Sequence, residues 1–220
     1  MIDAVRKLVS AEPEIYQDGY HFVCKSQGGL TCRAVIEAMD DHNVLNFVSL
    51  AGPQSGVFGT AFLSGLKWLP EWLVDFVTDN LYIAAYTFLG QFTSVGDMWR
   101  DPNHLEKFLK DDKFIPKYTE YATADMKSNF LKLQHAVFCV GSGPAYDGGI
   151  EPWQTGAWGS VVDGVMLNMT QRDFYINDTF GLRTLDETGR LNLTIVPNVT
   201  HGDWTFDERI IEKYVLPWCT

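Results

Sequence analysis

One short segment constrains the fold of this chain most, because an apolar strand there runs directly into a helix. The run Tyr20–Cys24 is typical of a buried strand, and an apolar helical face begins after Gln27. Between these elements lies Ser26, followed closely by Gly28-Gly29. A serine at such a turn, followed by small residues, is typical of a nucleophile elbow, which projects the hydroxyl away from the sheet. The segment therefore predicts Ser26 as a catalytic nucleophile.

The elbow pattern is met only in part, which leaves a second interpretation open. Cys24 stands where the pattern G-x-S-x-G has its first glycine. In the alternative, Ser26 merely caps the N-terminus of a helix and the glycines belong to a loop. In the elbow interpretation, the backbone N–H of Gln27 lies at the helix N-terminus, where it can stabilise an oxyanion.

The elements around this turn indicate an α/β fold with a parallel sheet. A second strand is expected at Val44–Leu50, so that strand, helix and strand form a βαβ unit of about 30 residues. Further strands are expected at His135–Val140 and Leu191–Val196, and helices at 1–9, 70–80 and 206–214. The sequence thus predicts an α/β core formed by residues 1–57 and 133–220.

Residues 58–132 differ in character and are expected to form a helical cap inserted into this core. The segment is rich in aromatic side chains, namely Trp68, Trp72, Phe76, Tyr82, Tyr86, Phe88, Phe92 and Trp99. A cap lined by such side chains could bury a fatty chain, at about 0.8 kcal/mol per methylene group. Alternatively, the aromatic side chains form only the insertion's own core.

A serine nucleophile needs a base and an acid, which follow it in the order acid then histidine in folds of this kind. His201 follows the last expected strand and is the predicted base. Asp147, in Ala-Tyr-Asp-Gly-Gly after the strand that ends near Val140, is the predicted acid, with Glu151 as a local rival. His201 would take the proton of Ser26, and Asp147 would orient the imidazole. The remaining candidates are expected elsewhere: His42 in a solvated turn, His104 in the insertion and His135 packed at the start of a strand.

The charge balance excludes several classes of protein. The chain has 17 basic and 28 acidic side chains and a net charge of −11, which repels nucleic acid over most of its surface. No window of about 18 residues is both uncharged and mostly apolar, so we expect no transmembrane helix. The four cysteines lack the spacing of a metal site, and no metal or cofactor is predicted.

An ordered set of motifs resembles the palmitoyl-protein thioesterases, which are lysosomal α/β-hydrolases. The matching stretches are Cys24-Lys-Ser-Gln-Gly-Gly-Leu with Arg33-Ala34, Asp40-Asp-His-Asn-Val, Gln54-x-Gly-Val-Phe-Gly, Trp99-Arg-Asp-Pro, Asp147-Gly-Gly-Ile-Glu-Pro-Trp-Gln and Phe180-Gly-Leu-Arg-Thr-Leu. The resemblance implies the triad Ser26, Asp147 and His201 and the cleavage of a fatty-acyl thioester without metal or cofactor. The features at Cys24 and Asp40 look like those of the second branch of the family. This resemblance implies acyl-CoA rather than S-acylated proteins as the substrate.

Four glycosylation sequons suggest the secretory route and therefore a lysosomal or secreted protein. They lie at Asn168, Asn177, Asn192 and Asn198. An oxidising compartment would favour a disulfide between Cys24, at the end of the strand, and Cys32, about two turns into the helix. The alternative is a pair of small buried thiols.

The N-terminal residues are not a signal peptide, and only 25 residues precede Ser26. Because family members carry early strands and an oxyanion loop before the elbow, we expect an N-terminally incomplete sheet. Two further interpretations stay open. The chain could be a lipase or carboxylesterase that acts on oxygen esters, or an inactive, truncated lipid-binding isoform.

Overall fold

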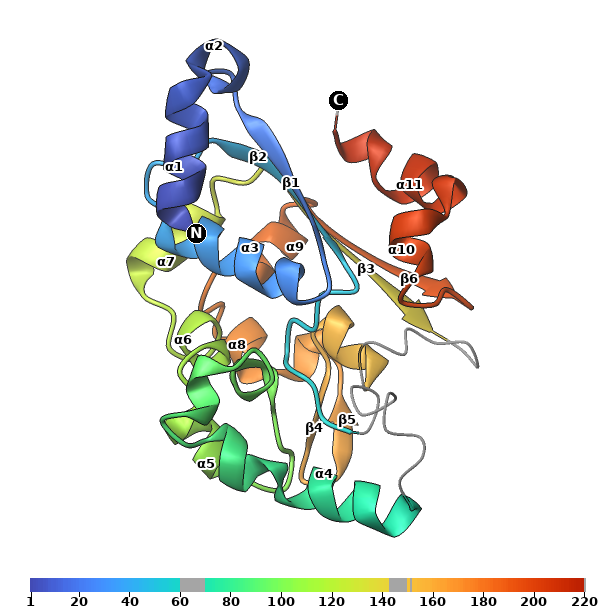
Figure 1. The fold of residues 1–220 in the computed structure, drawn as a ribbon. Coiled ribbons are helices and arrows are strands. Elements are labelled where there is room, and N and C mark those ends of the chain that lie inside the picture. Colours follow the sequence, from blue (N-terminus) through green and yellow to red (C-terminus); the bar gives the residue numbers. More distant parts are fainter. Residues whose placement is uncertain (60–69, 143–149, 151, 220) are drawn as a thin grey trace.

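The centre of the molecule is a parallel four-stranded sheet with the strand order β1-β2-β3-β6 (Figure 1). The computed structural model describes residues 1–59, 70–142, 150 and 152–219. The strands are β1 (Tyr20–Lys25), β2 (Val44–Leu50), β3 (His135–Ser142) and β6 (Leu191–Pro197). All three strand pairs are parallel, so the four carboxyl ends share one edge of the sheet. The expected α/β fold and its four strands are confirmed.

Helices account for most other described residues. The α-helices are α1 (Ile2–Ala11), α2 (Pro13–Tyr16), α3 (Gln27–Ala38), α4 (Glu71–Ala85), α5 (Leu105–Asp111), α6 (Ile115–Tyr118), α7 (Ala124–Phe130), α8 (Asp173–Ile176), α9 (Leu182–Glu187), α10 (Asp203–Phe206) and α11 (Glu208–Tyr214). Short 3₁₀ helices are η2 (Gly90–Phe92), η3 (Gly96–Met98), η4 (Trp153–Ala157), η5 (Met169–Gln171) and η6 (Leu216–Trp218). A separate hairpin consists of β4 (Ser160–Val162) and β5 (Val165–Leu167).

Several boundaries differ from the sequence-based expectations, most of all those of two helices. The helix expected over 70–80 continues to Ala85, since no proline or glycine interrupts it. The terminal helix expected over 206–214 is divided at Asp207, whose side chain accepts a hydrogen bond from the backbone N–H of Arg209 and caps α11. None of the described helices is long and apolar enough to span a bilayer.

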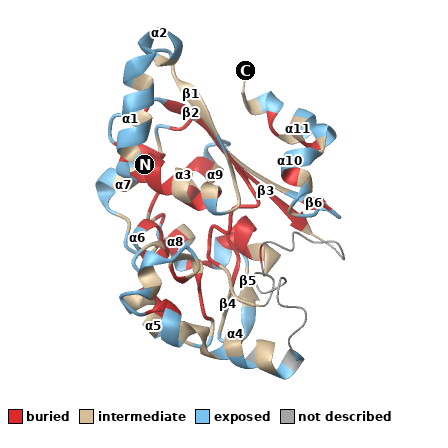
Figure 2. Cartoon of the chain, in the orientation of Figure 1, coloured by how far each residue is buried: buried red, intermediate tan, exposed pale blue. Residues whose placement is uncertain are grey.

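The two central strands, β2 and β3, are largely buried on both faces, whereas the outer strands β1 and β6 are only partly buried (Figure 2). Alternate strand residues point to opposite sides. Phe47 and Phe138 pack into a cluster that includes side chains of α3, α7, α8 and α9. Val48 and Val137 pack on the other side, against side chains of α10 and α11. This sandwich fixes the sheet and α3 relative to each other, and therefore fixes the turn that joins them.

The described part of 58–132 is helical and has its own small core. Tyr86, Trp99 and Phe108 are buried there, together with Leu30 of α3. A second set of side chains in the same segment is exposed, namely Trp72, Phe76, Ile83, Phe88, Leu89 and Phe92. The aromatic residues of this segment therefore divide between an internal core and the surface. The division of the chain at 58 and 132 stays a prediction.

A buried carboxyl group in this segment makes stability depend on pH. Asp112 is 5% exposed, and its Oδ1 accepts hydrogen bonds from the backbone N–H groups of Phe114 (2.9 Å) and Ile115 (3.0 Å). Its Oδ2 is buried without a hydrogen-bond partner among the described residues. Burial raises the pKa of Asp112 to about 7, and the nearby charge of Asp97 adds to this effect.

We expect Asp112→Asn to stabilise the protein at neutral pH. Because the pKa of Asp112 is higher in the folded than in the unfolded chain, its contribution to the free energy of unfolding is fully present below about pH 4. The contribution is lost as the pH rises toward 7. The variant should raise the free energy of unfolding at pH 8 by on the order of 2 kcal/mol.

Urea unfolding of both proteins between pH 4 and pH 8 measures this effect. Asp111→Asn is the matched control, because Asp111 is bound by Lys107 near the surface and that contact lowers its pKa. An Asp112→Asn variant that keeps the pH slope of the wild-type protein would contradict the prediction.

Candidate active site

Ser26 occupies a strained turn between β1 and α3. Its backbone angles are φ 55° and ψ −132°, a region that a residue with a side chain rarely adopts. Such a conformation costs about 1–3 kcal/mol and persists only where the surroundings impose it. Here the N–H of Ser26 donates to the carbonyl of Leu50 (2.9 Å), and the Ser26 carbonyl accepts from the N–H of Gly29 (2.9 Å). The turn has the form expected of a nucleophile elbow.

The hydroxyl of Ser26 does not cap α3. Ser26 stands at the N-cap position, but its side chain forms no capping hydrogen bond. The alternative interpretation of Ser26 as a capping serine is therefore wrong, and the hydroxyl at this strained position is not used to cap the helix. Gln27 is the first residue of α3, so its backbone N–H belongs to the helix N-terminus, as expected.

A glycine after the elbow lets α3 approach the sheet closely. A Cβ atom built on Gly29 would lie 3.0 Å from the Cα atom of Gly52 and would collide with the Ser49 hydroxyl. Only a residue without a side chain fits there. The N-terminus of α3 is consequently held against the carboxyl ends of β1 and β2.

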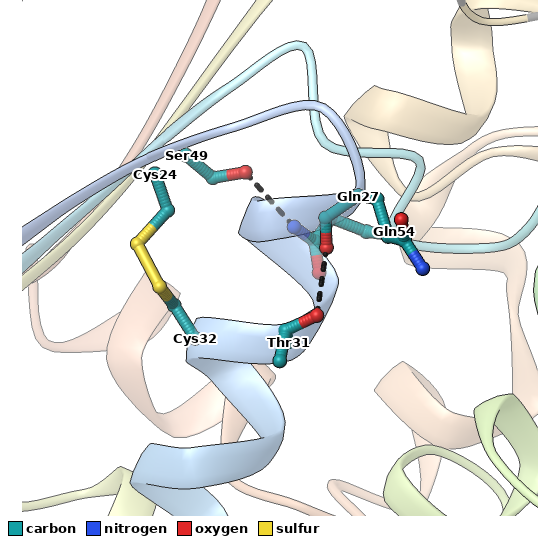
Figure 3. The surroundings of a disulfide bond; sticks show 6 residues. All are labelled: Cys24, Gln27, Thr31, Cys32, Ser49 and Gln54. Atoms are coloured by element: carbon teal, nitrogen blue, oxygen red, sulfur yellow. Dashed lines mark hydrogen bonds between the residues drawn. A yellow bond between two sulfur atoms is a disulfide. The ribbon is translucent and has the colours of Figure 1, made fainter. Parts of the chain in front are cut away.

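A disulfide bond joins the two sides of the elbow (Figure 3). It links Cys24 at the end of β1 to Cys32 on α3, with the two Cα atoms 6.6 Å apart. The expected bridge is confirmed, and the alternative of two free thiols at these positions is wrong. The remaining cysteines, Cys139 and Cys219, are unpaired. Because the bridge connects the strand before Ser26 to the helix after it, it restrains the turn that carries the serine.

Arg33, a buried residue of α3, was not assigned a role in the sequence analysis, but its contacts hold this helix in place. Arg33 is fully buried, and its Nε donates to Gln54 Oε1 (2.9 Å). Gln54 Nε2 in turn donates to the hydroxyl of Ser49 (2.9 Å; Figure 3). Arg33 Nη1 also donates to Glu37 (2.8 Å) and to the carbonyl of Tyr118 (2.6 Å). The chain of contacts ties α3 to the end of β2.

Glu37, one turn further along α3, is also fully buried. Burial raises the pKa of Glu37 to about 7, although the charge of Arg33 and its hydrogen bond act in the opposite direction. The guanidinium of Arg33 additionally lies 5.0 Å from the ring centre of Trp158. The signal in the sequence was the i, i+4 spacing of the two residues, which also fits an exposed surface pair.

The predicted base and acid follow two other strands of the sheet. His201 lies in the loop after β6, and this loop is held by Asp203, which accepts hydrogen bonds from the backbone N–H (2.7 Å) and hydroxyl (2.8 Å) of Thr200. β3 ends at Ser142, and Asp147 follows within 143–149, outside the described residues. Its rival Glu151 also lies outside them. Ser26 and His201 thus both follow carboxyl ends at one edge of the sheet.

The other histidines after Ser26 have structural partners. His42 was expected in a solvated turn, but this was wrong: it is buried, its Nε2 lies 3.0 Å from the carbonyl of Asn129, and burial lowers its pKa. His135, at the amino end of β3, packs against Trp218. His104 Nδ1 lies 3.0 Å from Asp101 Oδ2, within the insertion. None of these three follows the carboxyl end of a strand of the four-stranded sheet.

The four sequon asparagines differ in accessibility. Asn168, Asn177 and Asn198 are exposed, whereas Asn192 is half-buried on β6 and its Oδ1 accepts a hydrogen bond from Thr194 (2.7 Å). Glycosylation at these positions stays a prediction. Among the described residues, no group of His, Cys, Asp and Glu side chains is arranged to hold a metal ion.

A parallel α/β sheet that carries a strained serine at a strand-to-helix turn defines a protein of the α/β-hydrolase class. Residues 1–201 match the family model described as palmitoyl protein thioesterase, and the chain belongs to this family of hydrolases.

Curated relatives agree with this family. Lysosomal thioesterase PPT2 of Homo sapiens is 33% identical over 98% of this chain and 69% of its own length. The Drosophila melanogaster homologue of PPT2 is 30% identical over 99% of the chain and 74% of its length. Palmitoyl-protein thioesterase 3 of Dictyostelium discoideum is 29% identical over 100% of the chain and 72% of its length.

Proposed function

We propose that this chain hydrolyses fatty-acyl thioesters through a Ser26, His201 and Asp147 triad and an acyl-enzyme. The observation that carries the proposal is the elbow: Ser26 is held at φ 55° and its hydroxyl is not used to cap α3. Backbone strain at a residue whose hydroxyl makes no capping bond is typical of a functional position. Family membership and the names of the relatives support the thioester as the scissile bond.

In this mechanism each residue has a defined role. His201 removes the proton of Ser26 while Ser26 Oγ attacks the thioester carbonyl, and Asp147 orients and stabilises the imidazolium. The oxyanion that forms accepts a hydrogen bond from the backbone N–H of Gln27 at the start of α3. The thiol leaves with a proton from His201. Water then attacks the acyl-enzyme while His201 takes its proton, and the fatty acid leaves as Ser26 recovers its proton from His201.

We further propose that the insertion at 58–132 forms the groove for the acyl chain. The exposed apolar side chains of its described part, including Trp72 and Phe76 on α4, support this assignment. Acyl-CoA is the preferred substrate over S-acylated proteins, on the resemblance of the Cys24 and Asp40 segments to the second branch of the family.

A lysosomal location is proposed from the relatives named as lysosomal thioesterases, with support from the Cys24–Cys32 disulfide. We also propose N-glycosylation, with the three exposed sequons Asn168, Asn177 and Asn198 as the better acceptors, since a glycan needs a free surface asparagine.

Two assays test the function and separate it from its alternatives. A palmitoyl thioester and a palmitoyl oxygen ester, compared side by side, should give kcat/KM values that favour the thioester by about tenfold or more, equivalent to about 1.4 kcal/mol. A preference for the oxygen ester would favour a lipase or carboxylesterase. Labelling of Ser26 by a fluorophosphonate probe is also expected, and absence of labelling together with tight fatty-acid binding would favour an inactive lipid-binding protein.

A further inference from the structure

A cavity of about 240 Å³ lies where the loop after β2 meets the β4–β5 hairpin. Figure 1 shows the segment that follows β2 running from the sheet toward this hairpin. Val57, Phe58 and Pro152 contribute apolar walls, and Ser55, Arg100 and Thr155 contribute polar groups. The cavity is therefore mostly apolar and contains a few polar groups, as is typical of a site for a small ligand.

Three residues that line this cavity each carry a buried polar atom with no hydrogen-bond partner in the described part of the chain. These atoms are Ser55 Oγ, Thr155 Oγ1 and Arg100 Nε, on residues that are 2%, 3% and 7% exposed. Leaving such groups unpaired in the protein interior is unfavourable. The backbone holds two of them together, because the N–H of Ser55 donates to the carbonyl of Thr155 (3.1 Å). Three unpaired donors on residues beside one cavity indicate a missing acceptor.

The charge of Arg100 identifies the kind of acceptor. Arg100 Nη1 donates to the carbonyl of Val161 (3.0 Å), and no ion pair includes Arg100 among the described residues. The carboxylate of Glu120 lies nearer to the neighbouring Arg172, whose Nη2 is 3.4 Å from Glu120 Oε1. Burial and the like charge of Arg172 lower the pKa of Arg100 to about 10. A buried guanidinium without its own carboxylate favours an anion beside it.

We propose that this cavity binds an oxyanion, either a carboxylate or a phosphate ester, between Arg100 and the hydroxyls of Ser55 and Thr155. A guanidinium and two hydroxyls supply donors that match the oxygens of such a group. The apolar walls then accommodate the organic part of the ligand. This site does not depend on the proposed triad, and a fatty chain alone would leave its three donors unpaired.

Titration of the protein with inorganic phosphate and, separately, with hexanoate tests the proposal, with sodium chloride at equal ionic strength as the reference. Either anion should raise Tm saturably, by about 5 °C when its concentration is about 100 times Kd. A response to phosphate alone identifies a phosphate ester, and a response to hexanoate alone identifies a carboxylate. Isothermal calorimetry should give the same Kd as the thermal shift.

Variants of the lining residues show whether the effect belongs to this cavity. Ser55→Ala with Thr155→Val keeps the shape of the cavity and should weaken binding by about tenfold. Arg100→Gln should abolish binding. If that variant does not fold, the hydroxyl double variant alone decides the test. Arg209→Gln is the matched control, because Arg209 is exposed on α11 and should leave Kd unchanged. No saturable shift with either anion, or an equal shift in the hydroxyl variant, would overturn the proposal.

Discussion

Replacing Ser26 by alanine is expected to lower kcat for a palmitoyl thioester by at least about 10⁴-fold while leaving the fold intact. The hydroxyl is the proposed nucleophile, and without it no acyl-enzyme can form. The elbow itself should persist, since its conformation is imposed by the backbone hydrogen bonds of Ser26 to Leu50 and Gly29 and by the nearby disulfide. A Tm close to that of the wild-type protein would show that lost activity is not lost structure.

Turnover of palmitoyl thioester and labelling by a fluorophosphonate measure this effect together. Ser10→Ala is a matched control, because Ser10 is exposed on α1 and the same atoms are removed. The control should keep full activity and labelling. If Ser26→Ala retained wild-type turnover, the assignment of Ser26 as the nucleophile would be refuted.

Most of the sheet could be predicted from the sequence because its strands are short, mainly apolar runs. Tyr20–Lys25 and Val44–Leu50 are of this kind, although only the second is largely buried on both faces, and each prediction was correct to within one residue. The turn at Ser26 could also be predicted, since few backbone conformations connect a strand to a helix through a serine that is closely followed by two glycines. The local sequence was sufficient to predict the strands and this turn, because both depend mainly on neighbouring residues in the chain.

The hairpin of β4 and β5 was not predicted, although the sequence contains a signal for it. Asp163-Gly164 separates two short apolar runs, and the two residues have φ angles of 50° and 74°. An Asp-Gly pair with positive φ at both positions is the usual turn of a two-residue hairpin. The strands were missed because each has only three residues, too few to show an alternating pattern.

Contacts between distant segments could not be predicted. His42 follows two aspartates and looks solvated, but the carbonyl of Asn129 on α7 covers it. The burial of Arg33 likewise depends on Gln54 and on the carbonyl of Tyr118, which is 85 residues away in the chain. The periodicity of apolar residues identifies the face of a helix that becomes buried, but it does not show which distant segment packs against that face.

Arg33 gives the second large expected effect, on stability. Replacing Arg33 by methionine should lower the free energy of unfolding by about 3–5 kcal/mol at pH 8, because Glu37 is then buried without its partner and costs free energy at this pH whether it stays charged or takes up a proton. Gln54 and the Tyr118 carbonyl also lose their donor. At pH 5 the loss should be smaller, since burial already raises the pKa of Glu37 to about 7 and removing the arginine raises this pKa further.

The double variant Arg33→Met with Glu37→Leu separates the buried charge from the packing. If the uncompensated carboxylate causes most of the loss, removing it should recover a large part of the stability, and the recovery should be greater at pH 8 than at pH 5. Urea unfolding of the wild-type protein, both single variants and the double variant measures the coupling. Arg6→Met is the control, because Arg6 pairs with Asp41 at the surface and should have little effect at either pH. Losses for Arg33→Met that are equal at the two pH values, and that the second substitution does not reduce, would mean that Arg33 acts through packing alone.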